Sequence, residues 1–193
     1  NLNAFMNQFL AIANRTRFSS LAILFYLFSL TAGSFTAFGQ VRGIYVDSSP
    51  DEKISKISFF SPAQGYVAFD KWIGFTQDSG RTFTKKYITI SNVNYNNYQV
   101  NLTFGFTIEG VKAFDAKNII VYGDYGFGPS ILYSTDGGGT YKLIFHIGYN
   151  PQRYYATVSD MVFPGNGNMG YAVDLGRMLK TTDRGKTWNV IRS

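Results

Sequence analysis

The sequence predicts an all-β chain made of repeated units of four short antiparallel strands. The first observation is a pattern of hydroxyl residue, Asp, Gly, Thr and aromatic residue, which occurs in the octets TQDSGRTF, STDGGGTY and TTDRGKTW. The second is the spacing, because Asp78, Asp136 and Asp183 lie 58 and 47 residues apart. The third is that a short apolar strand, a polar turn and a second apolar strand precede each octet. Four strands per unit and a period of about 50 residues are typical of β-propeller blades.

Each octet lies between two strand-like runs, so we expect it to form a hairpin turn. The Asp carboxylate can accept hydrogen bonds from backbone N–H groups one to three residues on, and the Gly tolerates a positive φ. Thr and the aromatic residue then restart the strand, and we expect the aromatic ring to cover the sheet edge against the next unit. These structural roles fall to Thr76, Asp78, Gly80, Thr82 and Phe83, to Ser134, Asp136, Gly138, Thr140 and Tyr141, and to Thr181, Asp183, Gly185, Thr187 and Trp188.

The octet pattern resembles the Asp-box, or BNR, repeat, over about residues 54–191. That repeat occurs in β-propellers of sialidases, xyloglucanase-type glycoside hydrolases, sortilin-type receptors and the photosystem II assembly factor family. The third unit, GYAVDLGRMLKTTDRGKTWNVI, is most similar to the assembly-factor repeats, from which it departs at Asp174 and Arg184. The first two units end in Phe83 and Tyr141 in place of Trp. The resemblance implies a propeller in which the octets are structural and lie away from the ligand face.

The repeat divides the chain into segments. We expect a signal peptide in residues 1–39, a ring-closing strand in 40–51, and blades in 52–91, 108–148 and 156–193, with links at 92–107 and 149–155. Propellers usually close with about four to eight blades. We therefore expect the chain to be the N-terminal part of a longer propeller, the alternative being a ring completed by two copies.

The N-terminal segment has the features of a secretory signal peptide. Arg15 and Arg17 precede an uncharged run whose apolar centre is about ten residues long, shorter than the roughly 20 residues that span a membrane. Cleavage after Gly39 would release a secreted, periplasmic or cell-surface protein without a stable membrane span. A signal anchor is the alternative.

Composition restricts the chemistry. The chain has no Cys and one His, His146, which lies in a strand-like run, so we expect no Cys/His metal site, no cofactor and no Ser–His or Cys–His nucleophile. Without residues 1–39, which hold two basic residues and no acidic one, 16 basic and 12 acidic residues remain, a net charge of +4. The basic residues are scattered, whereas nucleic-acid binding favours a basic patch, so we expect no nucleic-acid partner.

The ligand face is predicted from topology. In a four-stranded meander the octets occupy the third turns, so the second turns and the links share the opposite face. Aromatic rings, amides and Arg on such a face suit a protein or carbohydrate partner. The candidates are Asp70, Lys71, Trp72, Tyr95, Asp124, Tyr125, Phe127, Arg153, Tyr154, Asp174 and Arg177.

Two functions remain open. The first is a non-enzymatic binding module, which we favour, and the second is a glycoside hydrolase whose catalytic residues lie partly outside this sequence. Asp70, Asp124 and Asp174 occupy equivalent turns, and a pair of acids about 5–10 Å apart could hydrolyse a glycoside. A sialidase is disfavoured, because no Arg-Ile-Pro element occurs and Arg81 and Arg184 lie inside octets.

Overall fold

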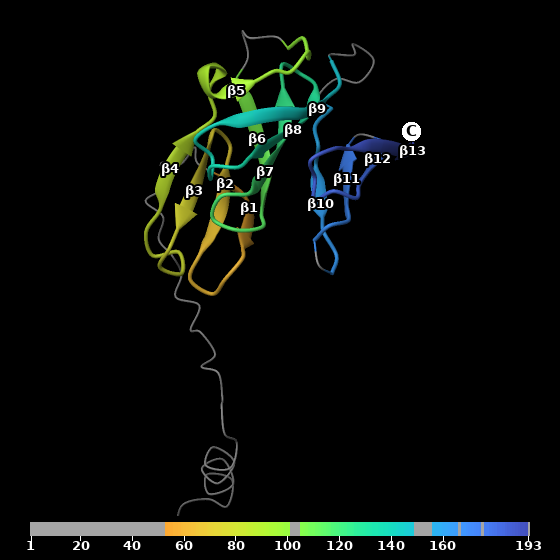
Figure 1. Ribbon diagram of the computed structural model, residues 1–193. Coiled ribbons are helices and arrows are strands. Elements are labelled where there is room, and N and C mark those ends of the chain that lie inside the picture. Colours follow the sequence, from red (N-terminus) through yellow and green to blue (C-terminus); the bar gives the residue numbers. More distant parts are fainter. Residues whose placement is uncertain (1–52, 101–104, 149–155, 166, 175, 193) are drawn as a thin grey trace, which may run out of the picture. The chain divides into compact units, whose positions relative to one another are not determined.

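The computed structural model describes residues 53–100, 105–148, 156–165, 167–174 and 176–192 (Figure 1). These residues all belong to the second of two compact units, Ile44–Ser193. The expected signal peptide and ring-closing strand, residues 1–51, lie outside the described residues. Within the described part, thirteen strands and one short 3₁₀ helix form three sheets.

The expected fold class is confirmed: the described chain is all-β and consists of three four-stranded antiparallel blades in chain order. Blade 1 contains β1 (Ile54–Phe59), β2 (Gly65–Phe69), β3 (Trp72–Thr76) and β4 (Thr84–Tyr87). Blade 2 contains β6 (Phe106–Ala113), β7 (Ile119–Tyr125), β8 (Pro129–Ser134) and β9 (Tyr141–His146). Blade 3 contains β10 (Asp160–Val162), β11 (Gly170–Asp174), β12 (Arg177–Thr181) and β13 (Asn189–Arg192).

The link between blades 1 and 2 adds a strand that the sequence did not indicate. After the 3₁₀ helix η1 (Ile90–Asn92), β5 (Val93–Asn94) pairs in parallel with the start of β9. Since β9 is the last strand of its meander, β5 covers backbone groups that would otherwise form an open sheet edge. Blade 2 is therefore a five-stranded sheet in the order β5-β9-β8-β7-β6.

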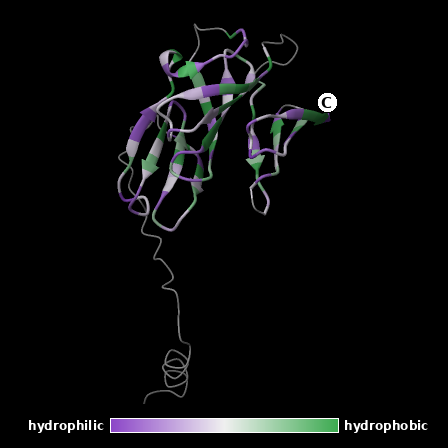
Figure 2. Cartoon of the chain, viewed as in Figure 1, coloured by the Kyte–Doolittle hydropathy of each residue, from purple (hydrophilic) through white to green (hydrophobic). Residues whose placement is uncertain are grey.

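Alternate residues of the strands pack on opposite faces of each blade, as the pleat requires. In β7, Ile119 and Val121 belong to the core between blades 1 and 2, while Ile120 and Tyr122 belong to the core between blades 2 and 3. Figure 2 shows the hydrophobic colours within the strands and hydrophilic colours at many turns. Blade 2 is thus apolar on both faces because it has a neighbour on each side.

Side-chain and backbone hydrogen bonds also join neighbouring blades. The backbone N–H of Ala113 donates to the Ser58 hydroxyl at 2.9 Å, and that of Ile108 donates to the Asp70 carbonyl at 2.9 Å. Between blades 2 and 3, the Val158 N–H donates to the Gly123 carbonyl at 3.1 Å. The inner strands of blades 1 and 3 are linked by the Lys56–Asp160 ion pair, 2.6 Å long and partly exposed. These bonds set the register in which neighbouring blades pack.

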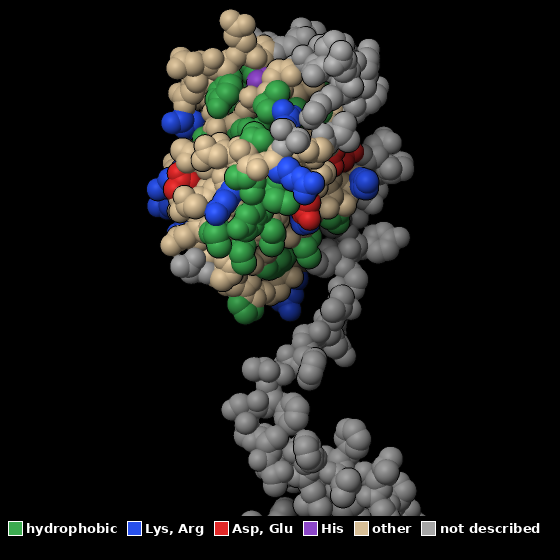
Figure 3. Space-filling model, turned by 90° about the vertical axis from the view of Figure 1, so that its right-hand side faces the viewer, with side chains coloured by type: hydrophobic (Ala, Val, Ile, Leu, Met, Phe, Trp, Pro, Cys, Tyr) green, Lys and Arg blue, Asp and Glu red, His purple; other side chains and the backbone are tan. Residues whose placement is uncertain are grey.

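The face of blade 3 opposite blade 2 exposes apolar side chains, which gather in the view of Figure 3. Val173 and Met178 are cross-strand partners there, 37 and 39 % exposed, and Val162 is 58 % exposed. Their strand neighbours Ala172 and Leu179 are buried against blade 2. Blade 3 therefore has the same two-sided apolar pattern as blade 2.

We predict that neighbouring residues of β12 differ sharply in their contribution to stability. Leu179→Ala should lower the free energy of unfolding by about 2–5 kcal/mol, because Leu179 is fully buried between blades 2 and 3. Met178→Ala is the matched control. It should lower the free energy of unfolding by less than about 1 kcal/mol, since the Met178 side chain is exposed. Urea denaturation followed by circular dichroism measures both, and equal losses would contradict the two-sided packing.

Candidate functional site

The three octets form turns with the same hydrogen bonds at the ends of β3, β8 and β12. In the second octet the Asp136 Oδ1 accepts backbone N–H groups of Gly139 and Thr140, each at 2.9 Å, and Oδ2 accepts the Thr140 hydroxyl at 2.7 Å. The Ser134 hydroxyl donates to Oδ1 at 2.8 Å and accepts the Gly138 N–H at 2.8 Å. The carboxylate therefore binds N–H groups three and four residues on, further along the turn than the sequence suggested.

The octet carboxylates are held in their charged form by these bonds. Burial alone would raise the pKa of Asp136, but the hydrogen bonds from Thr140 and Ser134 outweigh it and lower the pKa to about 2. In the first octet the hydrogen bonds from Thr82 hold the pKa of Asp78 at about 2. Because each carboxylate is saturated by its own turn, the octets offer no reactive group.

The octet aromatics do not cover the edge against the next blade, and this expectation was wrong. Tyr141 packs in the core between blades 1 and 2, and Trp188 in the core between blades 2 and 3, so each faces the preceding blade. Phe83 packs on Val67, Phe69 and Trp72 of its own blade. The reason is strand alternation, which fixes the face of the first residue after the turn.

The second turns carry the predicted ligand-face residues, and here the blades differ. Asp70 and Lys71 form the β2–β3 turn tip, where Lys71 is exposed. Trp72 is only 3 % exposed, because it stacks on Phe69 with ring centroids 3.7 Å apart and lies beneath the Lys85 ammonium. The indole is therefore part of the blade 1 interior and is not available to stack on a ligand.

Tyr125 is likewise enclosed. It is 1 % exposed, and its hydroxyl shares a 2.5 Å hydrogen bond with that of Tyr95, whose ring lies parallel to it. Tyr95 and Tyr98 from the link pack on blade 2, Tyr98 against the edge of His146. Arg153 and Tyr154 lie outside the described residues.

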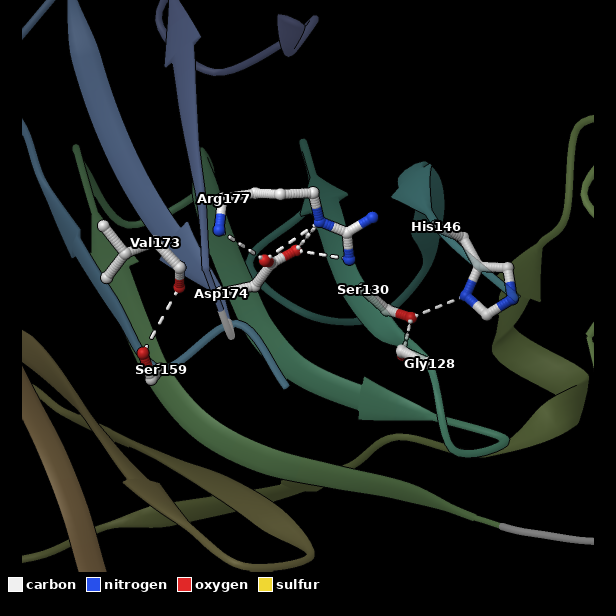
Figure 4. Close-up of polar contacts among 7 residues, drawn as sticks. All are labelled: Gly128, Ser130, His146, Ser159, Val173, Asp174 and Arg177. Carbon is white, nitrogen blue, oxygen red and sulfur yellow. Dashed lines mark hydrogen bonds and ion pairs between the residues drawn. The ribbon is translucent and has the colours of Figure 1, made fainter. Parts of the chain in front are cut away.

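Asp174 and Arg177 form a buried ion pair across the β11–β12 turn (Figure 4). The Arg177 Nε donates to both carboxylate oxygens, at 3.0 and 2.9 Å, and its backbone N–H donates to Oδ1 at 3.2 Å. The Asp174 side chain is fully buried and the Arg177 side chain nearly so. Both charges are thus neutralised within the turn.

Asp124 occupies the equivalent place in blade 2 without such a partner. The Phe127 N–H donates to its Oδ1 at 3.2 Å, but Oδ2 is buried and accepts no hydrogen bond in the structure. Burial, with a smaller effect of the nearby Glu109 charge, raises the pKa of Asp124 to about 6. The sequence predicts that Asp124 and Asp174 are equivalent. The one sequence signal that their surroundings differ is the third residue after each, which is Phe127 in blade 2 and Arg177 in blade 3.

His146 and Ser130 form a pair that the sequence did not indicate (Figure 4). The His146 Nδ1 lies 2.8 Å from the Ser130 hydroxyl, which donates its proton to the Gly128 carbonyl at 2.7 Å. The imidazole therefore donates to the serine, the reverse of a general base. Ser130 is fully buried, and burial lowers the pKa of His146, so the pair joins strands and does not act as a nucleophile. A bulge in the β8–β9 pairing hides this contact from residue counting.

Metal sites, membrane-spanning helices and cavities are other features that would bear on function. Within the described ranges, no group of three or more His, Cys, Asp and Glu side chains is placed to hold a metal ion. No helix in this described part is long and apolar enough to cross a membrane. A cavity of about 470 Å³ lies at the outer edge of blade 2, formed by residues 91–94 and the ends of β8 and β9. It adjoins the octet, not the second turns.

Comparison with known proteins gives fold neighbours and no family. No model of a known protein family matches the chain, and no curated protein matches it. Among solved structures, it is similar to YCF48 bound to D1 peptide, with 18 % identity, a TM-score of 0.49, and coverage of 72 % of this chain and 40 % of that one. It is also similar to the GH74 enzyme of Niastella koreensis, with 16 % identity, a TM-score of 0.44, and coverage of 72 and 22 %. A third neighbour is the GH74 xyloglucanase of Xanthomonas campestris, with 14 % identity, a TM-score of 0.47, and coverage of 69 and 19 %.

The chain thus spans less than half the length of each of these neighbours. Likeness at this level assigns no activity, partner or site residue. The function has to be argued from the chain's own geometry.

We predict that acid weakens the fold through the octet carboxylates. Their lowered pKa means that the charged form stabilises the fold above about pH 4, the unfolded value, and that this contribution is lost as pH falls toward about 2. Asp136→Asn should lower the urea midpoint at neutral pH and flatten its decline between about pH 4 and 2. Thr135→Ala, exposed in the same octet, should behave like the wild type; an unchanged Asp136→Asn profile would refute the prediction.

We predict that Asp124→Asn stabilises the protein at neutral pH. Because the pKa of Asp124 is raised, its neutral form stabilises the folded protein. This stabilisation is complete below about pH 4 and is lost as pH rises through about 6, where the poorly solvated carboxylate becomes charged. The amide carries no such charge, so the variant should gain about 1–2 kcal/mol at neutral pH and nothing near pH 4. Urea denaturation at both pH values measures this, and a neutral-pH loss would show that Asp124 has a cation partner.

Proposed function

We propose that this chain is a binding module of the propeller class that takes a protein partner on the face formed by the second turns and links. The observation that carries the proposal is the contrast between the two ends of the blades. At the octet end, the carboxylates are saturated within their own turns. At the other end, short turns between the strands carry Lys71, which is exposed, and Asp70 and Asp124, which are partly exposed.

A protein partner suits this face better than a glycan. Sugar-binding sites need aromatic rings whose faces are open, and Trp72 and Tyr125 are both buried. The ring of Tyr95 packs against Tyr125. What the turns present is mainly charge, with Lys71 exposed and Asp70 and Asp124 partly exposed, which suits the polar contacts of a protein interface.

The finer features of the proposal rest on sequence. We propose that the octets are Asp-box repeats and that the chain is exported, with cleavage after Gly39 to give a secreted, periplasmic or cell-surface protein. The octet pattern and the basic-then-apolar N-terminal segment support these two points.

The test screens residues 1–193 against a displayed random peptide library and against a glycan array. We expect retained peptides and no retained glycan. Lys71→Glu should weaken binding to retained peptides about 10-fold, because it reverses a charge on the proposed face. Lys186→Glu, the same change at an exposed octet position, should leave binding unchanged. Binding only to glycans, or equal losses in the two variants, would overturn the proposal.

One observation favours the second candidate, a glycoside hydrolase. A general acid in such enzymes needs a raised pKa, and burial, with a smaller contribution from the Glu109 charge, raises that of Asp124 to about 6. Release of nitrophenol from model glycosides, lost in Asp124→Asn, would support a hydrolase. Absence of release from the wild type, together with peptide binding, would leave the binding module.

A further inference from the structure

The two junctions between blades repeat one arrangement. Each joins the forward face of one blade, which looks toward the next, to the rear face of the blade that follows. On the forward faces of blades 1 and 2 the middle strands hold fully buried cross-strand pairs, which are Ala68–Ile73 and Tyr122–Ile131. Counted back from the octet, Val173 and Met178 hold the same positions in blade 3, yet both are more than a third exposed (Figure 3). Within the described residues, no further sheet packs on this forward face.

Blade 1 has an open position on its rear face. In blades 2 and 3 the inner strand places Val111 and Met161 on the rear face, where they are 3 and 8 % exposed against the preceding blade. Ile57 of β1 holds the same position, as its pairing with β2 shows, but it is 63 % exposed. Ile54 and Phe59 of the same strand are exposed as well. The chain therefore carries both halves of the repeated junction, each without its counterpart.

We propose that a second copy of this chain docks head to tail, with the forward face of blade 3 on the rear face of blade 1 of the second copy. Two such junctions would close two sets of three blades into one ring, and the total lies within the about four to eight blades of known propellers. The contact uses the flat sides of the blades. It therefore goes beyond the proposed function and leaves the second-turn face free.

A tyrosine of the forward face fits this occupant. At the first junction the Tyr66 hydroxyl donates to the Gly137 carbonyl of the next octet at 3.2 Å. Tyr171 holds the place of Tyr66 in blade 3, since each pairs with the residue just before its octet. In the single copy its hydroxyl donates to the Met169 sulfur at 3.5 Å, a weak acceptor. In blade 1 of a second copy, Ser79 holds the octet position and the positive φ of Gly137, so its carbonyl can accept the Tyr171 hydroxyl.

The charges also favour the octet of blade 1 as the neighbour of blade 3. Burial raises the pKa of Tyr133, and the third octet acts on it too, Arg184 lowering the pKa and Asp183 raising it. Tyr133 therefore lies beside that octet. In blade 3 the same position is occupied by Lys180, and in the first octet Ser79 stands in the place of Arg184. A junction between two copies would thus place one cation near the octet carboxylate, with no second cation to repel it.

The test is sedimentation of residues 1–193 over a range of concentrations. We expect wild type to pass from a monomer of 21.6 kDa to a dimer of twice that mass. Val173→Lys on the forward face and Ile57→Lys on the rear face should each weaken the dimer at least about 100-fold, because each places an unpaired charge in an apolar junction. Both side chains are exposed in the single copy, so the circular dichroism spectrum should stay that of the wild type.

Val190→Lys is the matched control. Val190 is an exposed apolar residue of blade 3, but its pairing with Leu179 places it on the rear face, toward blade 2. The dimer should therefore be unchanged. Tyr171→Phe is the mild variant, and it should weaken the dimer about 10-fold by removing one hydroxyl from each junction.

Mixing the two face variants tests the head-to-tail arrangement. Each variant alone has an altered face at both junctions. A mixed pair has one unaltered junction, formed by blade 3 of the Ile57→Lys copy and blade 1 of the Val173→Lys copy. Mixed dimers should therefore form at concentrations where neither variant dimerises alone.

Several outcomes would overturn the inference. These are a monomer at every concentration, assemblies of more than two copies, and a dimer that survives either face variant. Loss of the dimer in Val173→Lys alone would mean that blade 3 packs on blade 3 of the other copy, and no dimer in the mixture would mean that the two faces do not meet. None of these results bears on the proposed function, because peptide binding is measured separately with Lys71→Glu.

Discussion

Each blade depends on one carboxylate that organises its outer hairpin. In the octets the aspartate accepts backbone and hydroxyl donors from the residues that follow, so the chain reverses within a few residues. The turn then serves as a docking surface for the preceding blade. The Gly137 carbonyl accepts the Tyr66 hydroxyl and the Lys86 ammonium of blade 1, at 3.2 and 2.7 Å. Arg184 of the third octet lies over Phe114 and 3.7 Å from Asp115 of blade 2.

The octets therefore fix the outer ends of the blades, and strand alternation fills the space between them. A blade with two neighbours must be apolar on both faces, which explains why Ile119 to Tyr122 form an unbroken apolar run. With the third turns and both faces committed to packing, the second turns and links are left to vary. Variation there, as between Phe127 and Arg177, changes what the protein presents without changing the blade.

Similarity among repeats can hide chemical difference. Asp124 and Asp174 have the same place and the same backbone hydrogen bond, yet one is neutralised by Arg177 and the other has a carboxylate oxygen without a partner. A position in a predicted ligand-face turn also does not make a side chain accessible. Trp72 and Tyr125 occupy such turns but are buried by packing within the protein. A turn position alone does not decide whether a side chain meets a partner.

The sequence by itself determined the all-β fold, the repeat period and the position of each octet turn, because hairpin geometry depends on residues that are close in the chain. It also placed Asp70, Asp124 and Asp174 at equivalent turns for the same local reason. Only the tertiary structure decided which aromatics are buried, that β5 pairs in parallel with β9, and that Ser130 pairs with His146 beyond a bulge at Ile131 and Leu132. These depend on residues of other strands and on register, which local pattern does not encode. The unpartnered oxygen of Asp124 is of this second kind, since burial depends on every element packed around it.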